Sequence, residues 1–166
     1  MYKLKLFIKD EELKRMYNHR VNDHNNMIMN NLCADSGFDL LFVEDIMMDS
    51  ASVNRYKCEL IDMGVKCEML NEKGENVGFY IYPRSSMSKT PLVLGNHVGI
   101  IDAGYRGYIK VALRNLLHDE RFELKKHTRL TQICSSDLRP FYIEIVNEED
   151  LTVSKRGEGG FGSTGK

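Results

Sequence analysis

Residues 96–115 read NHVGIIDAGYRGYIKVALRN, a stretch that sets one carboxylate and one aromatic ring beside glycines. Residues 98–101 are mostly apolar and β-branched, which favours an extended strand over a helix. Asp-Ala-Gly-Tyr then indicates a turn, and from Tyr108 onward polar and apolar residues alternate with the period of a half-buried strand. The stretch therefore predicts a β-hairpin with Asp102 and Tyr105 at its tip. An acid placed there suits chemistry, although an ordinary Asx turn is the commoner explanation of an isolated Asp-x-Gly.

The chain after residue 38 is a succession of short apolar or alternating runs separated by turn residues. The runs are, in order, FDLLFV, YKCELI, VKCEML, VGFYIYP, YIKVALRN, RLTQIC and FYIEIV. Many short strands of this kind predict an all-β sandwich or barrel. NEKGEN, at 71–76, is the clearest hairpin turn, and no repeat or linker indicates a second domain. We therefore expect one β domain over residues 1–155, followed by a glycine-rich tail over 156–166.

The beginning of the chain has a different character. MYKLKLFIK, residues 1–9, alternates as a strand does and does not look like a signal peptide. Residues 10–19 predict a short helix, with Asp10 as its N-cap and acidic residues in its first turn. The asparagine-rich stretch RVNDHNNMIMNN, residues 20–31, is expected to be a loop. The all-β domain is therefore expected to contain one short helix at most.

Charge and composition narrow the classes of function. The 166 residues include 23 basic and 24 acidic ones, so we expect no stable binding of nucleic acid over a broad surface. No stretch approaches the ~20 apolar residues of a membrane span, and no membrane association is expected. The four cysteines lack Cys-x-x-Cys spacing, which predicts free, buried thiols in a reducing compartment. We expect a cytosolic or nuclear protein, with a viral protein acting in its host cell as an alternative.

Three further stretches hold residues suited to a phosphorylated ligand. DSGFDLLF at 35–42 puts Gly37 and Asp39 ahead of a strand, and YPRSSMSK at 82–89 brings an arginine, two serines and backbone amides into one turn. Oriented N–H groups, hydroxyls and a guanidinium match phosphate oxygens. The tail RGEGGFGSTGK places Phe161 among glycines, where its ring could cover a planar base. Taken singly, each stretch also fits a solvated turn or a flexible end.

Taken together and in order, these stretches resemble the five motifs of the trimeric dUTP pyrophosphatase (dUTPase) family. The matching segments are Gly-x-Asp-Leu at 37–40, Pro-Arg-Ser-Ser at 83–86, Gly-Ile-Ile-Asp-x-x-Tyr-Arg-Gly at 99–107, Arg-Leu-x-Gln-Ile at 129–133 and Arg-Gly-x-Gly-Gly-Phe-Gly-Ser-Thr-Gly at 156–165. The resemblance covers the chain from Ala34 to the last residue. The fourth motif departs from the family, which usually opens it with Gly-Asp where this chain has His127 and Thr128.

The resemblance implies a distorted β-barrel or jelly-roll of short antiparallel strands and a homotrimer. It also implies that dUTP is hydrolysed to dUMP and pyrophosphate by attack of water at the α-phosphate, with Mg²⁺ as cofactor. Such an activity limits the incorporation of uracil into DNA and supplies dUMP for dTMP synthesis. In that family each active site is assembled from several subunits, and the C-terminal arm of one chain closes over a site formed by its neighbours.

The same resemblance implies roles for individual residues. Asp102 corresponds to the general base that activates the attacking water, and Asp39 to the acid that holds Mg²⁺ through water. Phosphate-contacting positions correspond to Arg84, Ser85, Ser86 and Gln132, and those of the closing arm to Arg156, Gly162, Ser163 and Thr164. The positions that recognise uracil and deoxyribose correspond to Asn96, Gly99, Tyr105 and Phe161.

Two alternative functions stay open. A dCTP deaminase resembles the same fold and also makes trimers, but its catalytic glutamate should fall at Ala112, which cannot relay a proton. A non-catalytic trimer that senses nucleotides or binds a partner would keep the fold without turnover. Residues 10–33 show little resemblance to the family, so any second interaction role is expected there.

Overall fold

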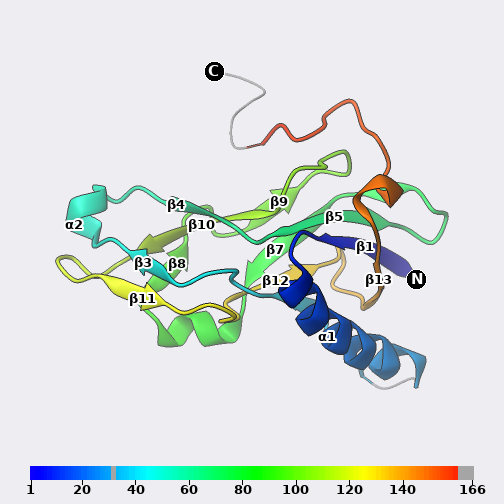
Figure 1. Cartoon of the computed structure of the whole chain (residues 1–166), viewed down its shortest axis with the longest axis horizontal. Coiled ribbons are helices and arrows are strands. Elements are labelled where there is room, and N and C mark those ends of the chain that lie inside the picture. Colours follow the sequence, from blue (N-terminus) through cyan, green and yellow to red (C-terminus); the bar gives the residue numbers. More distant parts are fainter. Residues whose placement is uncertain (31–32, 161–166) are drawn as a thin grey trace.

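The computed structural model describes residues 1–30 and 33–160 as a domain of short strands with one long helix (Figure 1). The strands are β1 (Tyr2–Ile8), β2 (Gly37–Leu40), β3 (Ile46–Met48), β4 (Glu59–Asp62), β5 (Val65–Leu70), β6 (Asn76–Val77), β7 (Phe79–Pro83), β8 (Leu92–Leu94), β9 (Gly99–Ile101), β10 (Lys110–Asn115), β11 (Phe122–Leu124), β12 (Thr131–Cys134) and β13 (Phe141–Ile145). The helices are α1 (Glu11–Met29) and α2 (Ala51–Asn54), with 3-10 turns η1 (Ser85–Lys89) and η2 (Glu148–Asp150). The predicted all-β class is confirmed. None of these helices is long and apolar enough, within the described ranges, to cross a membrane.

The strands pair into four small sheets, with strand orders β13-β1-β5-β6, β4-β10-β8, β11-β3 and β2-β12-β7-β9. Over the described residues these sheets stay open and do not close into a barrel. The pairs are antiparallel except β1–β13, where parallel pairing sets Tyr2 opposite Phe141. The expectation of antiparallel strands is therefore wrong at this pair. A parallel pair needs a long crossover, and here most of the domain lies between its two strands.

The predicted hairpin over residues 96–115 is wrong, because its two strands belong to different sheets. β9 pairs with β7, with Ile101 opposite Phe79, whereas β10 lies between β4 and β8. The turn itself forms as expected, since the Tyr105 N–H donates to the Asp102 carbonyl oxygen at 2.9 Å. Alternating polarity indicates a strand without indicating its partner, so long-range packing decided between one hairpin and two sheets.

The hairpin turn predicted at residues 71–76 is confirmed. The Gly74 N–H donates to the Asn71 carbonyl oxygen at 3.0 Å, and the Asn71 N–H donates to the Glu75 carbonyl oxygen at 2.9 Å. Gly74 has a φ of 77°, a value that residues with a side chain rarely adopt. This hairpin could be predicted because the hydrogen bonds that form it are local.

α1 begins where the sequence predicts. The Asp10 side chain accepts a hydrogen bond from the Leu13 N–H at 2.9 Å, so it caps the helix. Glu11 and Glu12 occupy the first turn, where carboxylates interact favourably with the helix dipole. Tyr17 follows Leu13 at a helical spacing, and both side chains are buried against the sheet.

α1 is longer than predicted and continues through the asparagine-rich stretch to Met29. Two polar side chains of that stretch are buried and contact the backbone of β13. Asn25 donates to the Ile143 carbonyl oxygen at 2.8 Å and accepts from its N–H at 3.0 Å, while His24 Nε2 lies 2.9 Å from the Phe141 carbonyl oxygen. These contacts stabilise the helix despite the weak helix propensity of asparagine. The expectation of a loop there is therefore wrong.

The hydrophobic core draws side chains from strands of several sheets and from α1. The largest fully buried ones are Tyr17, Phe42, Phe141, Leu4, Leu6, Leu40, Leu41, Met48, Met63, Met69, Ile81 and Leu92. The four cysteines are free, and Cys67 and Cys134 are buried as expected, whereas Cys33 is exposed and Cys58 only partly buried.

Candidate functional site

One sheet carries four of the five motif segments. In the order β2-β12-β7-β9, Asp39 lies on β2, Gln132 on β12, Arg84 directly after β7 and Asp102 directly after β9. The register sets Gln132 opposite Asp39 on one side and Tyr82 on the other. The first, second and fourth motifs therefore meet through three neighbouring strands.

Asp102 lies at the other end of β7 from Arg84. β7 and β9 run antiparallel with Phe79 opposite Ile101, so Asp102 adjoins the first residue of β7, while Arg84 follows its last residue, Pro83. Five residues of extended strand at ~3.3 Å each separate these two places by roughly 16 Å. The predicted site residues accordingly line two different pockets of one chain.

The larger of the two has a volume of about 730 Å³, and we call it the arginine pocket. Its lining includes the predicted residues Asp39, Arg84, Ser85 and Gln132, together with Arg20 from α1. The lining also includes Asp23 and Asp35, so the pocket combines carboxylates, guanidinium groups, hydroxyls and an amide, which are groups that bind phosphate or a hydrated cation.

Three guanidinium groups surround the Asp39 carboxylate, whose side chain is only 13% exposed. Arg84 Nε lies 2.6 Å from Oδ1, while Arg20 Nη2 and Arg129 Nη1 lie 3.1 and 3.2 Å from Oδ2. Ion pairs with such direct hydrogen bonds hold all four side chains in place. Three guanidinium groups thus share one carboxylate, so the hydrogen-bonding capacity of the arginines is not used up by Asp39.

The Pro-Arg-Ser-Ser segment is fixed by the strand next to it. The Arg84 N–H donates to the Leu130 carbonyl oxygen at 2.8 Å, and Arg84 Nη1 donates to the Arg129 carbonyl oxygen at 2.8 Å. Ser86 Oγ donates to the same Arg129 oxygen at 3.3 Å and lies 3.4 Å from Arg84 Nη1. Ser85 is exposed beside them at the start of η1. These contacts present Arg84 and Ser85 to the arginine pocket on a rigid support.

Gln132 reaches this pocket because residue 37 is a glycine. Its Nε2 donates to the Pro83 carbonyl oxygen at 3.3 Å. A Cβ atom at Gly37 would collide with the Oε1 and Cδ atoms of Gln132. The glycine of the first motif therefore leaves the space that the end of the Gln132 side chain occupies, and it adopts no unusual backbone angle.

The second pocket, of about 180 Å³, surrounds Asp102, and we call it the Asp102 pocket. Its lining includes the predicted residues Asn96, Gly99, Asp102, Tyr105 and Arg156. The Asp102 side chain is 50% exposed, and its Oδ2 lies 2.8 Å from Nη2 of Arg156. The first residue of the C-terminal arm thus contacts the predicted general base of its own chain.

Tyr105 forms a rigid wall of this pocket. Its ring is largely buried, and its hydroxyl donates to the Tyr108 carbonyl oxygen at 2.8 Å. Burial raises the pKa of the Tyr105 phenol, so this group stays neutral at physiological pH. A Cβ atom added at Gly107 would collide with the ring, and one added at Gly160 of the arm would lie in tight contact with the same edge of it. The ring therefore has little freedom to move.

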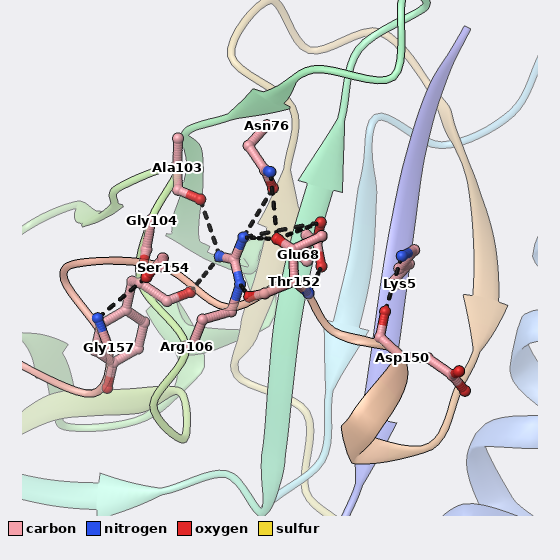
Figure 2. Close-up of polar contacts among 11 residues, drawn as sticks. Lys5, Glu68, Asn76, Ala103, Gly104, Arg106, Asp150, Thr152, Ser154 and Gly157 are labelled. Atoms are coloured by element: carbon pink, nitrogen blue, oxygen red, sulfur yellow. Dashed lines mark hydrogen bonds and ion pairs between the residues drawn. The ribbon is translucent and has the colours of Figure 1, made fainter.

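The arm leaves the domain through a buried cluster centred on Arg106 (Figure 2). Arg106 Nε donates to the Thr152 carbonyl oxygen at 2.7 Å, Nη2 donates to Asn76 Oδ1 at 2.9 Å, and Nη1 donates to the Ala103 carbonyl oxygen at 2.9 Å. Glu68, whose side chain is fully buried, accepts from the Thr152 N–H at 2.8 Å and lies 3.8 Å from Arg106. The cluster connects the Asp102 turn to the start of the arm.

Two further contacts hold the beginning of the arm. The Arg106 N–H donates to the Gly157 carbonyl oxygen at 2.8 Å, and Ser154 Oγ donates to the Gly104 carbonyl oxygen. Lys66 Nζ lies 2.5 Å from a carboxylate oxygen of Glu158. The arm is therefore attached to its own chain as far as the described residues extend. The predicted arm residues Phe161, Gly162, Ser163 and Thr164 lie outside the described residues.

The structure brings the predicted residues together as two groups and adds residues that the sequence interpretation did not assign. These are Arg20, Arg106 and Arg129. Arg106 and Arg129 lie inside motif segments, so their position in the sequence could have indicated that they belong near the site. Arg20 gave no signal, because its segment had the composition of a loop.

The model of the dUTPase family matches residues 23–165, a range that includes all five motif segments. The chain belongs to the dUTPase family. The match begins inside α1, so residues 11–22 of that helix precede the part shared with the dUTPase model.

Individual dUTPases agree with this assignment. The deoxyuridine 5'-triphosphate nucleotidohydrolase of Nautilia profundicola is 39% identical over 132 residues, which are 79% of this chain and 84% of that protein. The protein of the same name from Clostridioides difficile is 33% identical over 155 residues, 90% of this chain and 99% of that protein. Among solved structures, the dUTPase from Streptococcus mutans superposes with a TM-score of 0.50 at 26% identity, covering 64% of this chain and 78% of that one.

Proposed function

We propose that this protein is a dUTP diphosphatase, which hydrolyses dUTP to dUMP and pyrophosphate. The observation that carries the proposal is the family match over residues 23–165, together with the motif side chains at two pockets. Its relatives are named deoxyuridine 5'-triphosphate nucleotidohydrolase. In a cell, the reaction would limit the incorporation of uracil into DNA and supply dUMP for dTMP synthesis.

Asp102 is the general base in this proposal. Its carboxylate is half exposed in its pocket and can accept a proton from a water molecule. The water oxygen forms a bond to the α-phosphorus, the proton passes to Asp102, and the bond from the α-phosphorus to the bridging oxygen breaks. The products are dUMP and pyrophosphate. General base catalysis of this kind contributes about 10²–10⁴-fold.

The arginine pocket binds the triphosphate. Arg84, Ser85 and Gln132 line it, and Ser86 supports Arg84 from behind. Charge develops over the phosphate oxygens in the transition state, so donors that are already fixed in position stabilise it. Arg156, Ser163 and Thr164 of the arm close over the outer phosphates, with Gly162 allowing the backbone to follow them.

The residues of the arginine pocket fit Mg²⁺ held through water. Within residues 1–30 and 33–160, no three His, Cys, Asp or Glu side chains gather as a metal cage. Mg²⁺ keeps several of its waters and prefers phosphate oxygens, so one protein carboxylate, that of Asp39, is sufficient to hold it through water. When bound with the triphosphate, Mg²⁺ would neutralise part of its negative charge.

A complete site requires more than one copy of the chain. Asp102 and the arginine pocket lie at opposite ends of β7, too far apart to act on one α-phosphate. Pairing the Asp102 pocket of one protomer with the arginine pocket of another fits a closed ring. The homotrimer that the family resemblance implies is such a ring, with three equal sites formed from three chains. The arm of each chain then closes over a site formed by its neighbours.

The Asp102 pocket selects the base and the sugar. Asn96 and the backbone at Gly99 recognise the polar edge of uracil, and a tight pocket excludes the methyl group of thymine. The buried, hydrogen-bonded ring of Tyr105 cannot retreat, so it leaves no room for a 2′-hydroxyl. Phe161 stacks on the uracil.

Two other functions would use the same fold. A dCTP deaminase would need a carboxylate at residue 112, where this chain has the buried Ala112 on β10. A nucleotide-sensing or partner-binding trimer would bind dUTP without turnover. The presence of Asp39, Asp102 and Gln132 at the two pockets favours the hydrolase.

The deciding experiment measures pyrophosphate release from dUTP, UTP, dCTP and dTTP at equal concentrations, with and without Mg²⁺. Turnover of dUTP alone, greatest with Mg²⁺, is the expected result. Binding of dUTP without pyrophosphate release would refute the hydrolase and support a sensing role. Ammonia release from dCTP would instead support deamination.

A further inference from the structure

Arg20 belongs to α1 and not to any motif, yet its side chain lies at the arginine pocket. It precedes residue 23, where the family match begins. Its Nη2 lies 3.1 Å from Asp39 Oδ2, and its guanidinium lies 5.9 Å from the centre of the Phe38 ring. Both contacts are made with neighbouring residues of β2, so they fix the direction of the Arg20 side chain as well as its distance from Asp39.

The helix that carries Arg20 is held firmly against the pocket. The Tyr17 hydroxyl accepts a hydrogen bond at 2.9 Å from the N–H of Leu41, the residue directly after β2. About two turns after Tyr17, His24 and Asn25 contact the backbone of β13. Arg20 lies between these two attachments on nearly the same helix face. The guanidinium is therefore positioned before any ligand arrives, which reduces the entropy cost of binding.

Neutralising Asp39 does not require Arg20. Arg84 already contacts Oδ1 at 2.6 Å, and Arg129 contacts Oδ2 at 3.2 Å. The other two carboxylates of the pocket lining, Asp23 and Asp35, make no ion pair with Arg20 within the described ranges, and Asp23 lies 3.0 Å from His19 instead. The Arg20 side chain is 27% exposed, and its one hydrogen bond to the described residues is the contact with Asp39. The Arg20 Nε atom is buried without a partner among the described residues, so the donors that remain for a ligand are on the terminal nitrogens, of which Nη1 makes no hydrogen bond there.

We propose that Arg20 is an additional triphosphate-binding residue, which α1 supplies beside the motif arginine. The inference rests on the proposed function, because the ligand is the triphosphate of dUTP. An arginine binds phosphate oxygens through two parallel hydrogen bonds, and it does so best where its side chain is already oriented. Arg20 thus acts on the β- or γ-phosphate and contributes nothing to the binding of dUMP.

The test compares Arg20→Gln with Arg15→Gln, an exposed arginine of the same helix. Both changes remove one positive charge, so their difference isolates the position of the side chain. Calorimetry in the presence of Mg²⁺ measures the affinity of each trimer for α,β-imido-dUTP and for dUMP. Arg20→Gln should bind the imido analogue about tenfold more weakly or worse, the size of one charge-assisted hydrogen bond. The affinity for dUMP should stay within twofold, and Arg15→Gln should match the parent for both ligands.

Introducing Arg20→Gln into a protein that already carries Asp39→Asn distinguishes a direct contact of Arg20 with phosphate from an effect of Arg20 on Asp39. If Arg20 contacts phosphate, the loss caused by Arg20→Gln persists when Asp39 is already Asn. Disappearance of the loss in that background would refute the proposal and leave Arg20 as a residue that only positions Asp39. Equal losses for the imido analogue and dUMP would refute it too. A parent protein that neither binds the imido analogue nor hydrolyses dUTP would instead refute the proposed function.

Discussion

Arg156 Nη2 lies 2.8 Å from Oδ2 of Asp102, so the first residue of the C-terminal arm forms an ion pair with the proposed general base of its own chain. Both side chains are substantially exposed, and ion pairs in such places contribute only about 0–1 kcal/mol. The contact can therefore exchange for a contact with substrate at little cost. It keeps the beginning of the arm close to the Asp102 pocket of its own chain.

Asp102→Asn should abolish nearly all hydrolysis while preserving the trimer and its affinity for α,β-imido-dUTP. The amide has the same shape but cannot take a proton from water, so kcat should fall by about 10²–10⁴-fold. Initial rates of pyrophosphate release measure the effect, with the exposed Asp119→Asn as control. Activity within tenfold of the parent would exclude Asp102 as the base.

Deletion of residues 156–166 should leave a folded trimer with severely reduced kcat. The cluster around Arg106 and Thr152 remains in the shortened chain, so the domain should keep its stability. Size-exclusion chromatography with light scattering checks the assembly, and the pyrophosphate assay checks turnover. An unchanged rate would mean that the arm has no part in the reaction.

Arg106→Met should destabilise the domain by roughly 3–5 kcal/mol, because it leaves the buried Glu68 carboxylate without its cation. The double variant Arg106→Met with Glu68→Gln should lose less than the two single changes added together. Urea unfolding of all three measures the free energies, and Arg139→Met, an exposed arginine, is the control. Strict additivity would contradict a direct coupling of Arg106 and Glu68.

The stability of the domain should fall as the pH drops below about 6.5, the ordinary pKa of histidine. Burial lowers the pKa of His24 in the folded protein, outweighing the contact with the Phe141 carbonyl oxygen, which raises it. The unfolded chain then binds the proton more tightly, so acidification favours unfolding. His24→Gln should reduce this pH dependence in thermal melts between pH 7.5 and pH 5. The control is His19→Gln, an exposed histidine of the same helix, and an equal pH dependence in all three proteins would exclude His24 as its source.

Local interactions explain what could be predicted from the sequence. The turn at Gly74, the Asp10 cap of α1 and the turn after Asp102 each depend on hydrogen bonds between residues within four positions of one another. The all-β class follows from the many short alternating runs. The pairing of β9 with β7 rather than β10 could not be predicted in this way, since strand periodicity does not identify a partner.

The sequence by itself therefore determined the class of the fold, the family and the identity of the motif residues. Only the tertiary structure decided where those residues act. It placed Asp39 and Asp102 at different pockets, it made the asparagine-rich stretch helical through the contacts of His24 and Asn25, and it brought Arg20 to Asp39. The physical reason is that these outcomes depend on contacts between residues far apart in the chain. Their free energies appear only after strands and helix have packed, and no local pattern of residue types carries them.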